Sequence, residues 1–298
     1  MRVNPNYSSD TVSMINQAQQ AENTAVQQLS TGRRVNLPSD NPAAEAAMVG
    51  ENAQSAAADQ YTANSDSLTD VLNTANSTLS SVTTLLQRAV TLGVEGANGT
   101  NNQTDLNSIA SEISGIQSQV VSLANTSYAG QYLFSGTVSG IAPYAPDATD
   151  PTQIDYAGNG EQNRVQIGTG LSVASNLPGS SIFSQSGANV FSALQSLVTA
   201  LQSGDSSSIA TAGTGVSTAL DAVDTAQVFY GNTVNELTTN ETYLSQEKVN
   251  ISTYENTLVS SDTATAATNM TQAETILNAT IAAAAQINQQ ANLLEYIQ

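Results

Sequence analysis

The sequence contains no cysteine, no histidine and no tryptophan. Without the first two residue types, the chain has no disulfide, no thiol nucleophile, no imidazole base and none of the usual zinc ligands. Aromatic residues are scarce as well, at 5% of the 298 residues. A core must therefore be built from Ala, Leu, Val and Ile, which favours thin helical bundles over a thick globular interior.

Positive charge is also scarce, with 6 Lys and Arg residues against 25 Asp and Glu residues and a formal net charge of -19. A nucleic-acid-binding protein needs a basic surface, so we expect no nucleic-acid partner. An anionic membrane surface is an unsuitable partner for the same reason. The most apolar late stretch, residues 276–287, is short and contains Asn278 and Thr280, so we expect no membrane span.

The longest regular pattern in the chain runs from residue 216 to residue 258. Apolar residues there recur at alternating steps of three and four, which is the heptad pattern of a helix with one narrow apolar seam. The pattern predicts a helix over residues 206–260, roughly 80 Å long at about 1.5 Å per residue. Because such a helix cannot bury its seam alone, we predict a mainly α fold: an elongated antiparallel helical bundle or coiled coil with a small β-rich insertion (α+β).

Heptad seams of large apolar residues also occur in residues 42–95 and 106–123, and a shorter helix is expected at residues 189–201. The Gly- and Asn-rich residues 96–104 predict a turn, so the first two segments should form a helical hairpin. The predicted bundle core contains Leu72, Leu79, Leu86, Ile113, Val120, Leu237, Leu244, Ile251 and Leu258.

Both ends of the chain carry weaker seams, in residues 8–29 and 270–294. Small residues occupy many seam positions there, so two helices can approach closely but bury little apolar area. Because the chain runs out and back, we predict that the two end helices pair. These assembly helices contain Ile15, Ala18, Ala25, Leu29, Leu277, Ala284, Ile287, Ala291 and Leu294.

A short linker follows the first helix, which we expect to end at Gly32 with Arg33 and Arg34 close to its last carbonyl groups. Two interpretations of this basic pair stay open: compensation of the helix dipole, or ion pairs with an acidic neighbouring subunit. Pro38 forces an extended link, and Asn41 caps the next helix. The predicted joint consists of Arg33, Arg34, Pro38, Asp40, Asn41 and Pro42.

The composition changes after residue 129, where prolines and aromatic residues become more frequent. Apolar residues alternate in residues 154–156 and 165–167, on either side of Gly158-Asn159-Gly160, which predicts a β-hairpin. Further short strands are expected at residues 171–173 and 182–183.

These patterns together predict three domains. Residues 1–40 and 262–298 form the terminal coiled coil, residues 41–129 and 186–261 the helical bundle, and residues 130–185 the β-rich insertion. Its Pro- and Gly-rich residues 141–185 lack heptads, so we expect them to face outward and to be dispensable for assembly.

Three patterns that look catalytic or ligand-binding are better explained as coincidence. Ser245 and Lys248 match a Ser-x-x-Lys motif, but they lie inside the heptad helix and lack the companion motifs. The spacing of Asp147, Asp150 and Asp155 fits no calcium-binding loop. Residues 168–170 lack the third glycine of a dinucleotide-binding loop. We therefore expect no catalytic, cofactor-binding or metal site, and no enzyme.

Four stretches carry a family resemblance. Residues 28–36 read QLSTGRRVN, and residues 38–43 read PSDNPA. Together they resemble the N-terminal signature of the bacterial flagellin superfamily. Residues 128–136, YAGQYLFSG, and residues 293–297, LLEYI, are most similar to its hook-filament junction proteins, the hook-associated protein 3 family.

The resemblance implies that the joint links an inner, axial coiled coil to the main bundle. It implies a structural subunit that joins the hook of the bacterial flagellum to the filament. The implied partners are further copies in a ring, flagellin, another hook-associated protein, the flagellar export apparatus and an export chaperone. It also implies an extracellular location, reached without a cleaved signal peptide. The first ten residues fit, since they are polar and lack the apolar segment of a secretory signal.

Three alternatives remain open at this stage. A filament flagellin needs the same paired terminal helices and axial bundle, so physical features do not separate it from a junction protein. A secreted adhesin or other binding module would use the β-rich insertion and would need a ligand groove. An enzyme in the insertion would need a convergent polar pocket.

Overall fold

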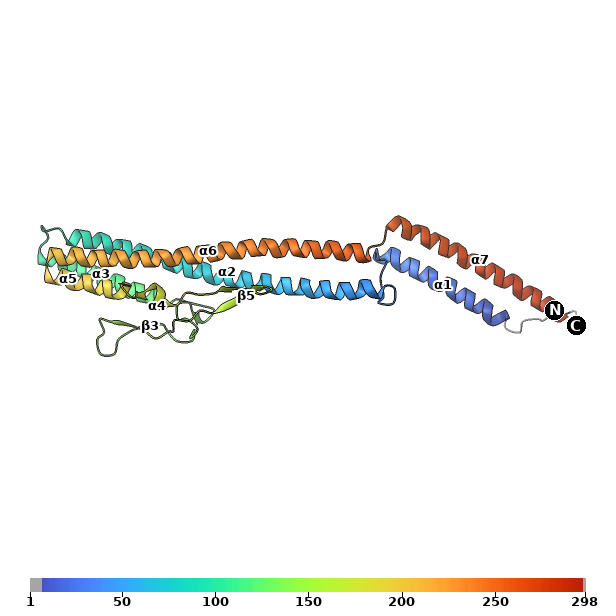
Figure 1. Cartoon of the computed structure of the whole chain (residues 1–298), viewed down its shortest axis with the longest axis horizontal. Helices are drawn as coiled ribbons and strands as arrows, with labels where there is room; N and C mark the ends of the chain where they lie inside the picture. The colour runs from blue at the N-terminus through green and yellow to red at the C-terminus, as the bar shows by residue number, and fades with distance from the viewer. Residues whose placement is uncertain (1–6, 297–298) are drawn as a thin grey trace. The chain divides into compact units, whose positions relative to one another are not determined.

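A computed structural model of the chain describes the backbone of residues 7–296 and the side chains of residues 9, 10 and 12–286. Long helices make up most of it, and short strands lie between α3 and α5 (Figure 1). The helices are α1 (Tyr7–Thr31), α2 (Pro42–Gly96), α3 (Gln103–Ala124), α4 (Gly179–Ile182), α5 (Val190–Ser203), α6 (Ser206–Val259) and α7 (Thr263–Tyr296). The predicted mainly α fold with a small β-rich insertion is confirmed.

Local capping signals explain where these helices begin and end. The Asn102 side chain accepts the backbone N–H groups of Thr104 and Asp105, and Asp105 accepts the N–H of Asn102 in return, so α3 begins with a capping box. Helix α5 is capped at its N-terminus by Asn189, whose side chain accepts the N–H of Ser192, and at its C-terminus by Gly204 in the left-handed conformation.

The strands form four separate two-stranded antiparallel sheets. Their pairs are β1 (Ser127–Tyr128) with β2 (Gln131–Tyr132), β3 (Tyr144–Pro146) with β4 (Ile154–Tyr156), β5 (Arg164–Gly168) with β6 (Leu171–Ala174), and β7 (Ser184–Gln185) with β8 (Ala188–Asn189). The prediction of a hairpin that pairs residues 154–156 with 165–167 is therefore wrong. The expected strand at residues 182–183 is also wrong, because Ile182 ends α4.

The end of β4 and the residues that follow it form hydrogen bonds with residues 134–137 instead of a tight turn. The Asn159 side chain accepts the N–H of Thr137 at 2.9 Å and donates to its hydroxyl at 2.6 Å. The hydroxyl of Tyr156 donates to the carbonyl oxygens of Phe134 and Asn159, both at 2.9 Å. These contacts tie the segment to residues 134–137, which are distant in sequence, so local alternation could not reveal them.

The chain forms two compact units, one within residues 1–57 and 246–298 and the other within residues 58–245. The main hydrophobic core lies in the second unit and combines side chains of α2, α3, α5 and α6. Of the predicted bundle-core residues in this unit, six have no exposed surface and Leu244 is 2% exposed. The six are Leu72, Leu79, Leu86, Ile113, Val120 and Leu237.

The side chains of the insertion belong to this same core. Phe134, Tyr144 and Phe183 are almost completely buried. The ring of Phe183 packs edge to face with Phe134 at a centroid distance of 5.3 Å and with Tyr144 at 5.7 Å. Tyr144 also contacts Phe191 of α5, at 4.9 Å. The expectation that residues 141–185 only face outward is therefore wrong, because these aromatic rings fill the space beside α3 and α5 that aliphatic seams leave open.

The remaining helical residues form the first unit, in which α2 begins and α6 ends. Val35, Ala44 and Val259 make a small buried cluster there, and Leu258 packs against it while remaining partly exposed. The predicted core residue Leu258 therefore lies outside the main core. Ile251, another predicted core residue, is 6% exposed.

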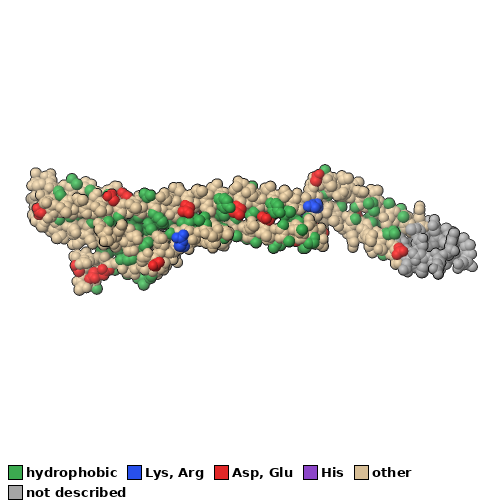
Figure 2. All heavy atoms as spheres, in the orientation of Figure 1, with side chains coloured by type: hydrophobic (Ala, Val, Ile, Leu, Met, Phe, Trp, Pro, Cys, Tyr) green, Lys and Arg blue, Asp and Glu red, His purple; other side chains and the backbone are tan. Residues whose placement is uncertain are grey.

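Charged residues make up only 10% of the chain, and most of them are acidic. Figure 2 shows isolated acidic and basic side chains separated by wide neutral areas. Within residues 7–296, no helix has an apolar stretch long enough to cross a lipid bilayer.

Candidate assembly site

Helices α1 and α7 lie side by side and pair along their length (Figure 1). Alanines make most of the buried seam, with Ala18, Ala25 and Ala284 each at most 6% exposed. Ile15 and Leu277 are half-buried, and Leu29 is 36% exposed. The predicted assembly residues Ile287, Ala291 and Leu294 lie outside the described side chains.

The pairing leaves large apolar side chains on the outside of both helices. Val12 and Met14 of α1 are 57% and 60% exposed, and Ile276 and Ile281 of α7 are about half exposed. A two-helix pair can turn only one face of each helix inward, and here that face is mostly alanine. The exposed apolar residues therefore offer a surface on which further helices can pack.

A short set of backbone bonds joins the two ends at the predicted joint. Gly32 ends α1 in the left-handed conformation, with a φ of +67°, and accepts the N–H of Ser261 at 2.8 Å. Arg33 forms an isolated β-bridge with Ser260, and the N–H of Arg34 donates to Val259 at 2.6 Å. We call the contact of residues 32–34 with residues 258–261 the clasp.

The two arginines of the joint differ in their surroundings. The guanidinium of Arg34 donates to the carbonyl oxygen of Leu258 at 3.0 Å, in the last turn of α6. Arg34 thus has a bond to the end of α6 that the sequence does not indicate, in addition to its position just after α1. The side chain of Arg33 is exposed and makes no hydrogen bond or ion pair with the described residues.

The turn between α1 and α2 is held by side chains of the joint. One carboxylate oxygen of Asp40 accepts the N–H groups of Asn36 at 3.0 Å and Leu37 at 2.9 Å. These two bonds favour the ionised form and lower the pKa of Asp40 below its ordinary value of 3.8. The Asn36 side chain donates in turn to the carbonyl of Arg33 at 2.8 Å.

The start of α2 follows directly. The side chain of Asn41 accepts the N–H of Ala44 at 3.1 Å, and Pro42 occupies the first helical position, where a missing N–H costs nothing. Pro38 is exposed in the turn that precedes it. The six predicted joint residues thus all lie between the end of α1 and the start of α2.

The sequence indicates residues 260–268 as the C-terminal counterpart of the Pro38 joint, but it does not reveal the contacts that Val35 and residues 258–261 make there. Residues 260–268 do lose their large apolar side chains, and that change marks the break between α6 and α7. Nothing in it specifies a β-bridge to Arg33, because the bridge joins positions more than 200 residues apart.

Among the described residues, acidic side chains do not cluster into a metal site, because no group of three Asp or Glu residues has an arrangement that could hold a metal ion. The backbone N–H groups of Asp150 and Thr149 lower the pKa of Asp147 to about 2, and a hydrogen bond with Asp147 raises the pKa of Asp155. The arrangement of helices and clasp is suited to assembly.

Comparison with known proteins agrees with this architecture. The family described as the bacterial flagellin N-terminal helical region matches residues 3–139, and the bacterial flagellin C-terminal helical region matches residues 214–297. Together these matches take in about three quarters of the chain. The chain belongs to the bacterial flagellin family. The family resemblance of its motifs is thereby confirmed, and the family is one of structural flagellar proteins.

Two relatives illustrate the range of this family. Flagellar hook-associated protein 3 of Escherichia coli is 34% identical over 191 residues, which are 59% of this chain and 58% of that protein. Flagellin D of Vibrio anguillarum is 30% identical over 139 residues, which are 46% of this chain and 37% of that protein. The chain thus spans less than two thirds of the length of these curated relatives.

A solved structure extends the likeness to the fold. The crystal structure of Bacillus cereus FlgL is 26% identical, with a TM-score of 0.57. The superposition covers 70% of this chain and 97% of that chain. Over this 70% of its length, the chain therefore shares the fold of that protein.

Proposed function

We propose that this protein is a structural subunit of the bacterial flagellum that joins the hook to the filament. The observation that carries the proposal is the similarity to hook-associated protein 3, which is longer and closer than the similarity to flagellin D. The paired terminal helices, with exposed apolar residues on their outer faces, support a role in assembly. In this role the protein acts as a structural part and not as an enzyme.

The proposed partners follow from this role. Further copies of the chain form a ring, which contacts another hook-associated protein on the hook side and flagellin on the filament side. Before assembly, the chain is a substrate of the flagellar export apparatus, escorted by an export chaperone, and it reaches the cell exterior without a cleaved signal peptide. Residues 1–40 and 262–298 form the axial part of the ring, and the joint links them to the helical bundle, residues 41–129 and 186–261, which carries the insertion, residues 130–185.

The joint supplies a specific contact for the ring. Arg33 is exposed and without a partner among the described residues, while the chain as a whole is strongly acidic. We therefore prefer, for Arg33, the interpretation of an ion pair with an acidic neighbouring copy. Arg34 has a different role, because its guanidinium is already bound to the end of α6.

The two arginines form a matched pair for testing this contact. Arg33→Ala should leave the thermal melt of the monomer unchanged and should reduce flagellar assembly in cells. Arg34→Ala should lower the melting temperature, because it removes the bond to Leu258. Equal behaviour of the two variants in both measurements would count against the ion pair.

The junction role itself is tested by assembly and by deletion. A junction subunit contacts different proteins above and below, so purified protein should stay monomeric at concentrations where flagellin, given seeds, grows filaments. Cells that lack it should make hooks without filaments and release flagellin into the medium. If seeded protein grows long filaments alone, the protein is a flagellin instead. The same conclusion follows if electron microscopy of flagella with this protein labelled shows the label along whole filaments.

A further inference from the structure

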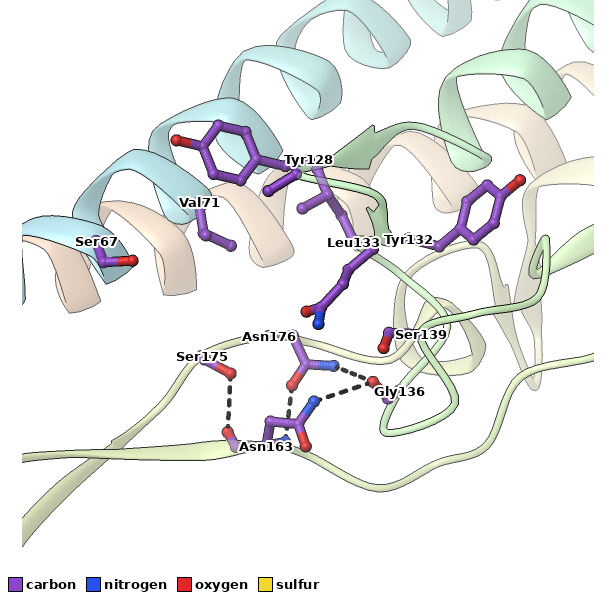
Figure 3. Close-up of a pocket in the computed structure, with 12 residues that line it drawn as sticks. Ser67, Val71, Tyr128, Tyr132, Leu133, Gly136, Ser139, Asn163, Ser175 and Asn176 are labelled. Carbon is purple, nitrogen blue, oxygen red and sulfur yellow. Dashed lines mark hydrogen bonds between the residues drawn. The ribbon is translucent and has the colours of Figure 1, made fainter. Parts of the chain in front are cut away.

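A pocket of about 250 Å³ lies in the unit of residues 58–245, between α2 and the loops that follow α3 (Figure 3). Residues of the YAGQYLFSG motif make up half of its lining. They are Tyr128, Ala129, Gln131, Tyr132, Leu133 and Gly136. Leu133 and Phe134 of this motif are buried in the hydrophobic core, whereas Ala129 and Gln131 are exposed. Neither burial in the core nor assembly through the terminal helices explains why these exposed residues are present.

The β1–β2 hairpin that carries the motif adopts an unfavourable turn at the pocket. Ala129 and Gly130 both have positive φ, +50° and +81°. Glycine adopts this conformation freely, whereas alanine does so rarely, and Ala129 is the only residue other than glycine that does so in residues 7–296. Strained backbone of this kind occurs preferentially at binding sites, where it holds neighbouring side chains in place.

The opposite side of the pocket is a rigid hydrogen-bonded floor (Figure 3). Asn176 is 7% exposed, and its side chain accepts the N–H of Asn163 at 2.8 Å while donating to the carbonyl of Gly136 at 3.1 Å. The hydroxyl of Ser175 donates to the carbonyl of Asn163 at 3.2 Å. The floor is therefore preformed, which lowers the entropy cost of binding a ligand.

Other polar groups of the lining have no partner within the described chain. The amide of Gln131 and the hydroxyls of Ser67 and Ser139 make no hydrogen bond there, and both oxygen and nitrogen of the Gln131 amide are available. Tyr128, Val71 and Leu133 provide an apolar wall beside them (Figure 3). The pocket thus offers donors, acceptors and an apolar surface together.

No charged side chain lines the pocket. A ligand with a full charge would lose part of its hydration without gaining an ion pair there, which favours a neutral ligand. It must also carry several groups that both donate and accept hydrogen bonds, next to an apolar face. A pyranose ring has hydroxyls around its edge and C–H groups on its faces, and it meets these requirements.

We propose that this pocket binds a neutral pyranose sugar, in addition to the role of the protein in assembly. The volume lies below the roughly 300–1,000 Å³ of pockets for drug-sized ligands, so it accommodates one ring, with any further rings of a glycan outside. A loop of a second copy is the alternative occupant, and the test below separates it from a sugar because only self-contact depends on protein concentration.

The experiment is saturation-transfer difference NMR on the full-length protein with four probes. Methyl glucoside, methyl galactoside and methyl mannoside are neutral, and glucuronate is the charged control. At least one neutral glycoside should receive saturation and glucuronate should not. Gln131→Ala should weaken the binding about tenfold, which corresponds to the loss of roughly one hydrogen bond. Gln131 is exposed, so the variant should melt like the wild type.

Gln119→Ala is the matched control, since Gln119 is an exposed glutamine of α3 outside the pocket. It should leave binding unchanged. The proposal is wrong if no neutral glycoside binds, if glucuronate binds equally well, or if both glutamine variants behave alike. It is also wrong if pocket resonances shift with protein concentration in the absence of sugar, because the occupant is then a second copy. Seeded assembly tests the junction role separately and does not depend on these results.

Discussion

The α1–α7 pair and the bundle of residues 58–245 are both built from helices with heptad seams, yet they bury very different side chains. In the bundle, Leu72, Leu79 and Leu86 have no exposed surface, and they belong to a core to which α3, α5 and α6 also contribute. In the pair, alanines fill the seam, and the larger Leu29 is 36% exposed. Full burial of a leucine contributes about 1.5–3 kcal/mol, whereas an alanine contributes far less. The same periodicity therefore specifies a self-sufficient core in one region and an incomplete interface in the other.

The largest test concerns the aromatic rings that extend the bundle core into the insertion. Phe183→Ala removes a fully buried ring that contacts both Phe134 and Tyr144, so it should destabilise the protein by about 3–5 kcal/mol. Chemical denaturation followed by circular dichroism measures the loss. Val138→Ala, at an exposed position of the same insertion, is the control and should cost less than about 0.5 kcal/mol. A small loss for Phe183→Ala would restore the view of a dispensable insertion.

A leucine from each region compares the two seams directly. Leu79→Ala creates a cavity in the bundle and should cost about 2–5 kcal/mol in the monomer. Leu29→Ala removes a side chain that is more than one third exposed, so it should cost about 1 kcal/mol or less. Denaturation of both variants under the same conditions gives the difference. Equal losses would mean that the terminal pair is as well packed as the bundle.

A smaller effect of opposite sign is expected at the β1–β2 hairpin of the bundle unit. Asparagine tolerates the left-handed conformation of residue 129 better than alanine does. Ala129→Asn should therefore raise the free energy of unfolding by roughly 0.5–1 kcal/mol. An increase in melting temperature checks this result. Ala157→Asn, outside the hairpin, serves as the control and should give no increase. A lower melting temperature for Ala129→Asn would show that the turn is not strained.

The smallest effect is expected at Asp40 in the joint of the terminal unit. Its two backbone bonds lower the pKa of the folded state below 3.8, so the ionised carboxylate stabilises the turn above about pH 4. That contribution is lost as the pH falls through the lowered pKa of the folded protein. Carbon-13 NMR of the carboxyl group gives the titration midpoint. A midpoint at or above 3.8 would contradict the expected bonds.

Trypsin provides a second readout of the same turn, since the chain has six sites and two of them are Arg33 and Arg34. Asp40→Asn should accelerate cleavage at these two arginines at neutral pH, because it removes the charge that holds residues 36 and 37. Cleavage at Arg164, in the other unit, is the internal control and should not change. Equal acceleration at all sites would indicate general unfolding instead.

Local features of the sequence determined the helices and most of their ends. Heptad spacing sustained over several turns can bury its apolar side chains only in a helix, so α2 and α6 were predictable to within a few residues. Capping depends on neighbouring residues, and for that reason Gly32, Asn41 and Pro42 marked their boundaries correctly. The side chains that the seams bury in the bundle follow from the same periodicity.

Tertiary structure alone decided the strand pairing, the place of the aromatic residues and the partner of Arg34. Tyr144 reads as a loop residue in the sequence, but it is buried because α3 and α5 leave a space that its ring fills. Arg34 follows α1 in sequence, yet it binds the last turn of α6, 224 residues away. The strands pair with their neighbours in sequence, but residues 156 and 159 bind residues 134–137 and this excludes the predicted hairpin. For Tyr144 and Arg34 the deciding contact joins distant parts of the chain, and local periodicity and capping carry no record of such contacts.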